Sequence, residues 1–230
     1  MEDKKMFKNI WRFNAVIIAI AGILGIIVLL FSGYFIYKET TRDRYKREIV
    51  NIDTETNIEE KFRLGHLQHI KGFMSVIVPL YSDQSFSLNY SGSKSTTSTR
   101  NILFSDLHNE TNKWLLPHNK FLITEHKLIN ESNSYRSDEN IITILYKIVK
   151  NDTNNDSRLT ESDKLIISLS EPNGNNYTEV LKNIDTIIGY ELINKEVIAI
   201  LYSRENQGFT AYIDLNGFKV KKEIKLPKFN

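Results

Sequence analysis

The sequence predicts one N-terminal membrane-spanning helix followed by an all-β domain. Two observations carry this prediction: a long apolar stretch at residues 15–37, and a series of short apolar runs separated by turn residues from about residue 61 onward. We therefore expect a cytoplasmic tail at 1–14, the transmembrane helix at 15–37, a juxtamembrane helix or linker at 38–60, and a β domain at 61–230.

The apolar stretch at 15–37 contains no charged residue and no proline. At about 1.5 Å per residue a helix of this length spans roughly 34 Å, which is enough to cross the hydrocarbon core of a bilayer. The stretch is longer than the apolar region of a signal peptide, and no small-x-small cleavage pattern follows it. These features favour an uncleaved anchor over a cleaved signal.

Small residues recur on the predicted helix at helical spacing, at Ala15, Ala19, Gly22 and Gly25. Small residues let the backbones of membrane helices approach closely, so this pattern predicts a partner helix in the bilayer. Lysine and arginine flank the helix on both sides in nearly equal number, which leaves the orientation open on charge alone. We favour a cytoplasmic N-terminus and a periplasmic β domain, because the chain has no cysteine.

The β domain is predicted from apolar runs that are rich in Ile, Val, Tyr and Phe. The expected strands are Phe73–Leu80, Ile102–Leu107, Phe121–Ile129, Ile141–Val149, Leu165–Leu169, Ile187–Ile193, Val197–Tyr202, Phe209–Leu215 and Lys219–Leu226. The dipeptide Asn216-Gly217 predicts a tight hairpin before the last strand. The Ser/Thr-rich segment 84–100 is expected to be a mobile polar loop.

The predicted strands also suggest an internal repeat. Three hairpins, at 101–117, 164–181 and 208–227, align with one another, and each is preceded by a further pair of strands. This pattern predicts three four-stranded, propeller-like repeats. Three units are too few for a closed propeller, so an open array, a partial propeller completed by a partner and a β-sandwich all remain open.

The insertion at 150–163, between the predicted strands Ile141–Val149 and Leu165–Leu169, is rich in oxygen-bearing side chains. It resembles an EF-hand-like calcium loop of the dockerin type, whose ligands stand at loop positions 1, 3, 5, 7, 9 and 12. The resemblance implies calcium as a cofactor. It implies as ligands Asp152, Asn154, Asp156, Arg158 through its backbone carbonyl, Thr160 and Asp163. Ser157 departs from the pattern, because the sharp turn usually has glycine there, and the alternative is an acidic turn that binds no metal.

The whole chain also resembles membrane-anchored proteins of Gram-negative bacteria. The resemblance rests on the Trp11-Arg12-Phe13-Asn14-Ala15 sequence before the anchor, the β repeats and the aspartate-rich loop. It implies a single-pass protein of the bacterial inner membrane and assigns no catalytic residue.

Several function classes are disfavoured by composition. The net charge is +2 and no Lys/Arg stripe with interleaved aromatic residues occurs, so we expect no nucleic-acid partner. The sequence contains no GxSxG, HExxH, P-loop or GxGxxG motif. Asp106, Asp185 and Asp214 lie near the ends of predicted strands, but no nucleophile or base can be assigned beside them. We therefore expect a protein that is not an enzyme.

The sequence thus predicts a non-catalytic, membrane-anchored accessory subunit of an inner-membrane complex of the transporter or efflux type, with a calcium-binding periplasmic β domain. Its expected partners are integral membrane proteins, contacted through the helix and the β domain. The alternative is a stand-alone periplasmic module that binds or senses a ligand. An anchored hydrolase with a site assembled from distant residues is a third alternative.

Overall fold

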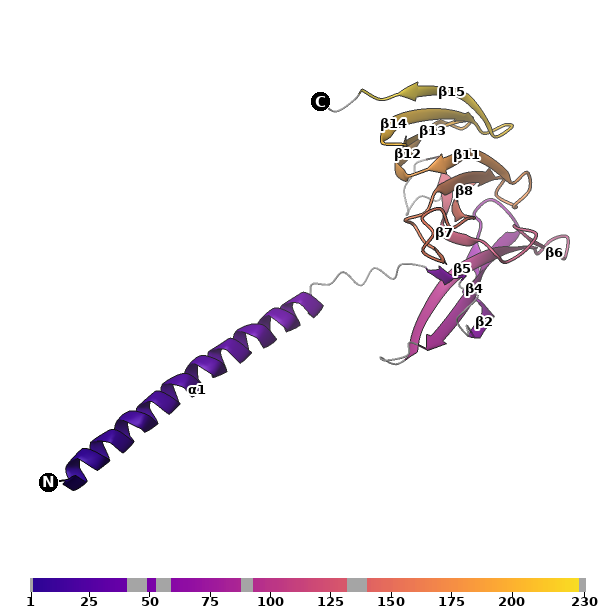
Figure 1. Cartoon of the computed structure of the whole chain (residues 1–230). Helices are drawn as coiled ribbons and strands as arrows, with labels where there is room; N and C mark the ends of the chain where they lie inside the picture. The colour runs from indigo at the N-terminus through magenta and orange to yellow at the C-terminus, as the bar shows by residue number, and fades with distance from the viewer. Residues whose placement is uncertain (1, 41–48, 53–58, 88–92, 132–139, 228–230) are drawn as a thin grey trace. The chain divides into compact units, whose positions relative to one another are not determined.

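The computed structural model describes residues 2–40, 49–52, 59–87, 93–131 and 140–227 (Figure 1). The chain divides into two units, Met1–Lys46 and Arg47–Asn230. The first unit contains the only helix of the described residues and the second contains all of their strands.

The N-terminal unit is the helix α1, Glu2–Thr40. Its segment Trp11–Tyr34 is the one part of the described chain that is helical, long enough and apolar enough to cross a membrane. The side chains of this segment are exposed to the surroundings throughout. The predicted apolar helix is confirmed. It extends beyond 15–37 at both ends, because neither flank has a proline or glycine to stop it.

The C-terminal unit is built from antiparallel strands. A nine-stranded sheet has the order β11-β10-β8-β7-β5-β4-β2, with β3 on β4 and β6 on β5; a second sheet has the order β12-β13-β14-β15; and β1 pairs with β9. The strands are β1 Val50–Asn51, β2 Glu59–Leu64, β3 Gln68–His69, β4 Ser75–Ser87, β5 Ser93–Asp106, β6 Thr111–Trp114, β7 Leu122–Asn130, β8 Ile141–Val149, β9 Arg158–Leu159, β10 Leu165–Ser170, β11 Thr178–Ile184, β12 Thr186–Asn194, β13 Val197–Arg204, β14 Gln207–Asp214 and β15 Lys219–Lys225.

These strands form three layers that follow one another along the unit (Figure 1). The first layer is β2–β6 and the second is β7, β8, β10 and β11. Within the nine-stranded sheet, β5 and β7 are joined at one registered pair, Thr99 and Ile123. The third layer is the separate sheet β12–β15.

Two apolar cores lie between the layers. The N-terminal core joins the first and second layers through residues such as Ile77, Ile102 and Tyr146. The C-terminal core joins the second and third layers through residues such as Leu145 and Ile200. Apolar packing between layers therefore holds the β unit together.

Strand β8 contributes to both cores. Ile144, Tyr146 and Ile148 belong to the N-terminal core, whereas Leu145 and Val149 belong to the C-terminal core. Successive side chains of a strand point to opposite faces of its sheet. The second layer is therefore apolar on both faces around β8, which explains why the run Ile141–Val149 lacks the usual alternation with polar residues.

The all-β prediction is confirmed, and most predicted strands lie within one or two residues of the observed ones. Three separate four-stranded repeats are not confirmed, because the first two layers share one sheet. The segment 84–100 was predicted wrongly: β4 extends to Ser87 and β5 begins at Ser93, and residues 88–92 lie outside the described chain. The residues of β5 up to Thr99 pair in register with β4, and Ser98 is buried, so this polar segment is a paired strand.

Two further boundaries differ from the sequence prediction. The β unit begins within 38–60, since Val50 in β1 is fully buried and belongs to the C-terminal core. The hairpin after β14 is longer than a two-residue Asn-Gly turn. Residues 215–218 connect the strands, and the left-handed residue is Phe218, with φ 47°.

Because β8 fills both cores, we expect Ile144→Ala and Leu145→Ala each to lower the free energy of unfolding by about 2–5 kcal/mol. Urea unfolding of the full chain in detergent, followed by the β signal in circular dichroism, measures both. Lys147→Ala on the same strand is the control and should cost under about 1 kcal/mol, because its ion pair with Glu125 is partly exposed. An alanine at either core position that left stability unchanged would contradict the two-core arrangement.

Candidate functional site

The first candidate site is the loop around β9 that contains the six predicted calcium ligands. Asp152 accepts backbone N–H bonds from Asp156 (3.2 Å) and Ser157 (2.8 Å). Asn154 accepts from the N–H of Asp156 (3.0 Å), and Asp156 accepts from the N–H of Arg158 (3.0 Å). Asn155 and Ser157 adopt left-handed backbone conformations, with φ 60° and 59°. The acidic and amide side chains therefore hold the tight turn by accepting its backbone N–H groups.

Asp163 closes this loop from its C-terminal side. The residue is 2% exposed, and its two carboxylate oxygens accept from the backbone N–H groups of Thr153 (2.7 Å) and Thr160 (2.9 Å). The hydroxyl groups of the same two threonines lie at 3.1 and 3.5 Å. Asp163 thus fastens the beginning of the loop to its end.

The described residues contain no group of three or more His, Cys, Asp or Glu side chains that could hold a metal. The carboxylates of Asp152, Asp156 and Asp163 serve the loop's own N–H groups instead. Leu159 of the same loop is 2% exposed and belongs to the C-terminal core. Calcium binding through the six residues remains a prediction.

The loop also fastens the first strand of the β unit. Val50 pairs with Leu159 and Asn51 pairs with Arg158, and the N–H of Ile52 donates to the carbonyl of Ser157 (3.0 Å). On its other side, Asn51 exchanges two bonds with the side chain of Gln84 in β4: its N–H donates to Oε1 (2.8 Å) and its carbonyl accepts from Nε2 (3.2 Å).

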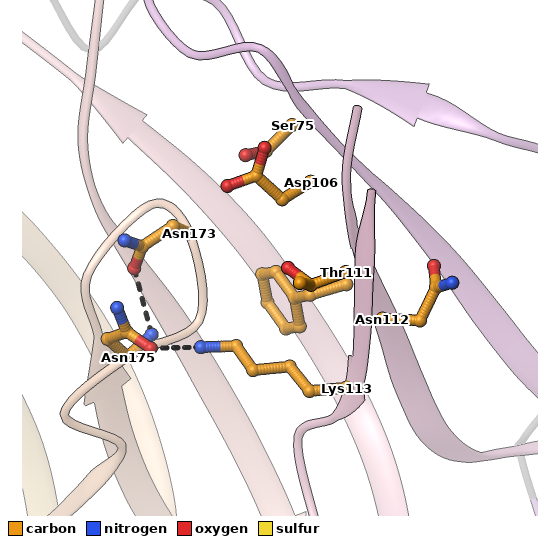
Figure 2. A pocket seen from close by; sticks show the side chains of 8 residues that line it. Ser75, Asp106, Thr111, Asn112, Lys113, Asn173 and Asn175 are labelled. Carbon is orange, nitrogen blue, oxygen red and sulfur yellow. Dashed lines mark hydrogen bonds between the residues drawn. The ribbon is translucent and has the colours of Figure 1, made fainter. Parts of the chain in front are cut away.

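The second candidate site is a pocket of about 210 Å³ between the first layer and the β10–β11 loop. Figure 2 shows polar side chains around it from both sides. The lining residues are Ser75 from β4, Phe104 and Asp106 from β5, Thr111, Asn112 and Lys113 from β6, and Asn173 and Asn175 from the loop.

The pocket's shape depends on how the β10–β11 loop rests on the first layer. Gly174 has φ 77° and lies over the ring of Phe104, so that an added Cβ would be 2.7 Å from the ring. Only glycine fits this close approach with a left-handed backbone. The Lys113 ammonium donates to Asn175 Oδ1, and Asn173 Oδ1 accepts from the N–H of Asn175 at 2.9 Å (Figure 2).

The pocket carries both signs of charge. Burial lowers the pKa of Lys113 from its ordinary value, and the nearby Glu171 carboxylate opposes this shift. The backbone N–H and the side chain of Asn109 lower the pKa of Asp106. The lowered pKa keeps the Asp106 carboxyl group ionised near neutral pH. With three amides and two hydroxyls around them, Lys113 and Asp106 match a small ligand that both donates and accepts hydrogen bonds.

Sequence reasoning did not assemble this pocket. In the sequence, Asp106 lies near the end of a predicted strand, and Asn173, Gly174 and Asn175 lie between two predicted strands. The other two aspartates noted with Asp106 make ion pairs: Asp185 with Lys164, and Asp214 with Lys221 at 3.3 Å. The sequence signal that points to the pocket is the tight turn Pro172-Asn173-Gly174, which lies in the β10–β11 loop.

Comparisons with known proteins are sparse. No protein-family model matches the chain, and no curated protein matches it. Among solved structures, the chain is similar to the β-propeller domain of the Trilobed protease from Pyrococcus furiosus, with 10% identity and a TM-score of 0.37. The match covers 74% of this chain and 45% of that chain. The present chain therefore spans less than half of that chain's length, and so distant a likeness carries no activity over.

If the loop binds calcium, we expect one weak site, with Kd on the order of 10⁻⁵ to 10⁻³ M. Calcium at 100 times Kd should then raise the free energy of unfolding by about 2.7 kcal/mol, because it binds only the folded loop. Thermal unfolding of the full chain in detergent, with and without calcium, measures this shift.

Asp152→Ala combined with Asp156→Ala should abolish the calcium-dependent shift. Glu161→Ala is the matched control, because Glu161 is an exposed acidic residue of the same loop outside the predicted ligand set. If millimolar calcium leaves the unfolding temperature of the wild-type chain unchanged, the predicted calcium site is ruled out.

Proposed function

We propose that the chain is a single-pass membrane protein whose β unit binds a small polar ligand outside the cytoplasm. The observation that carries this proposal is the pocket, where Lys113, Asp106 and the amides of Asn112, Asn173 and Asn175 line one polar cavity. Binding rather than turnover is proposed, because both charged groups already hold neighbouring residues in place. The three layers are proposed to be propeller-like repeats in an open array.

The chemistry of the lining favours a ligand with hydroxyl or amide groups, such as a sugar or peptide unit of the cell envelope. The proposed location is the periplasmic side of a bacterial inner membrane, with α1 as the anchor. We propose ligand binding ahead of a role as an accessory subunit, because the pocket is a defined site.

N-acetylglucosamine and diglycine are suitable probes for the pocket. At roughly 0.3 kcal/mol per non-hydrogen atom, N-acetylglucosamine should bind with Kd on the order of 10⁻⁴ to 10⁻³ M, and the smaller diglycine with Kd on the order of 10⁻² M. Lys113→Met should weaken binding about tenfold, because it removes a charged hydrogen-bond donor. Calorimetry on the full chain in detergent measures both.

Lys120→Met is the control for this measurement, since Lys120 is an exposed lysine outside the pocket lining. If neither probe binds when its concentration is about ten times the expected Kd, the proposed ligand class is wrong. Equal binding by the Lys113 and Lys120 variants would place any binding elsewhere on the chain.

A second candidate function is the accessory subunit of a transporter- or efflux-type complex, with calcium bound to its β unit. The helix supports it: small residues recur along α1 at Ala15, Ala19, Gly22 and Gly25, and small residues let a partner helix approach closely. Such a partner would be an integral membrane protein.

For this second candidate, Gly22→Leu with Gly25→Leu should release a co-purifying membrane protein, because added bulk blocks close helix packing. Quantitative mass spectrometry after purification in mild detergent measures the loss. Leu24→Phe adds bulk on the other side of the helix and is the control. If the glycine variant retains the partner, α1 is only a membrane anchor and does not carry recognition.

The proposed topology is tested separately. A reporter fused after Asn230 should be active only outside the cytoplasm.

A further inference from the structure

Exposed apolar side chains of the described β unit are concentrated on one edge of its first layer. Five of them lie in a single segment, residues 61–74, which comprises most of β2, all of β3 and the turn before β4. We name it the basic edge segment. Its exposed apolar residues are Phe62, Leu64, Leu67, Phe73 and Met74, with exposed fractions between 36% and 65%. Apolar side chains gathered on a surface in this way mark a contact with a protein or a membrane.

The fold holds the basic edge segment in place while its apolar side chains face outward. Gln68 pairs with the core residue Ile77, so Leu67 faces the opposite side of the sheet. Ile70 is fully buried in the N-terminal core, and its N–H donates to the carbonyl of Ser75 (3.2 Å). The segment is therefore a fixed part of the fold.

The centre of this outer side is covered, and the exposed apolar residues stand along its edge. Val76, Leu80 and Ser82 of β4 are buried. Leu64, which pairs with Leu80, is 55% exposed because it lies on the edge strand β2. The exposed surface is therefore a narrow rim, which suits a shallow contact rather than the packing of a second sheet.

The basic edge segment carries cationic as well as apolar side chains. No Asp or Glu occurs between residues 61 and 74. Two nearby carboxylates are already engaged: Asp83 pairs with Arg63 (2.7 Å), and Glu60 accepts from the Ser82 hydroxyl (2.5 Å). Apolar side chains interspersed with basic ones match the interface of an anionic bilayer. The basic residues are Lys61, Arg63, His66, His69 and Lys71.

We infer that the basic edge segment docks on the lipid surface of the membrane in which α1 is anchored. The length of the tether favours lipid over a separate protein as the occupant. Ten peptide steps separate Thr40, the last residue of α1, from Val50, the first residue of β1. At about 3.6 Å per step or less, Val50 lies no more than roughly 36 Å from the end of the helix. The bilayer is therefore always within reach at high effective concentration, so weak contacts suffice.

This inference rests on the proposed anchoring of α1 but not on the proposed ligand, because no residue that lines the pocket belongs to the basic edge segment. The absence of cysteine from the chain allows single fluorescent labels at Leu67→Cys and Met74→Cys. Each labelled full chain is reconstituted at one copy per nanodisc of phosphatidylglycerol and phosphatidylcholine. Doxyl-labelled lipids should quench both labels, because the apolar side chains of a docked segment enter the interface by about 5–10 Å.

Ile224→Cys is the matched control for the position of the labels. Ile224 is an exposed apolar residue on β15, a strand that is also rich in lysine but belongs to the third layer. Its label should stay unquenched. Equal quenching of the labels at positions 224 and 67 would overturn the assignment of the contact to the basic edge segment.

The charge contribution is tested with the label at position 67. Lys61→Gln with Lys71→Gln should shift the docking equilibrium about tenfold or more toward the undocked state, because each cation near an anionic surface contributes about fivefold. Lys222→Gln with Lys225→Gln on β15 is the matched control and should have no such effect. Circular dichroism of each variant establishes that the β unit is folded. An equal shift in both double variants would overturn the inference, because it would reflect net charge alone.

Failure of the anchor and failure of the docking give different results. A full chain that does not float with lipid vesicles refutes the anchoring of α1, and the docking with it. A chain that floats while its labels at positions 67 and 74 stay unquenched overturns the docking alone. A fluorescence change that requires two copies per nanodisc would identify a second copy as the occupant and would also overturn the inference.

Discussion

The burial of strand β8 on both of its faces is the constraint on which the rest of the β unit depends. Its side chains fill the N-terminal core on one side and the C-terminal core on the other. A strand in this position cannot carry charges inward, and its polar groups need partners. Thr143 accordingly donates to the carbonyl of Ser170 (2.8 Å), and the Tyr146 hydroxyl meets the Ser170 hydroxyl at 2.8 Å. The other layers are positioned by their packing against this strand.

Apolar strands were predictable because their signal is local. The run Ile141–Val149 has the composition of a buried strand and is one. The first half of β5 was missed because a Ser/Thr-rich sequence has a turn-like composition, although threonine itself favours strands. Its burial comes from neighbours such as Ser82 and Gln84, which only the folded chain brings together. Strand β1 has two residues and gives no periodic signal at all.

The two candidate sites differ in how much the sequence revealed. The loop around β9 is contiguous, so its spacing could be recognised, and its tight turn is present at Asn155 and Ser157. The spacing does not determine the direction of the carboxylates. In the structure they accept hydrogen bonds from the loop's own N–H groups. The pocket joins residues as far apart as Ser75 and Asn175, and its lining depends on how Gly174 rests over Phe104. No local pattern specifies such an arrangement.

The fastening of β1 has a mechanical consequence. Chain tension arriving from the N-terminal side reaches the β unit first at Val50 and Asn51. These residues are held by a two-residue ladder to β9 and by the Gln84 amide, whereas the interior strands are held by longer ladders on both sides. Under load this strand should detach before the layers separate, because only a short ladder, the Gln84 amide and the burial of the Val50 side chain hold it. A few residues at the N-terminal end of the β unit would then extend under load, while its three layers stay folded.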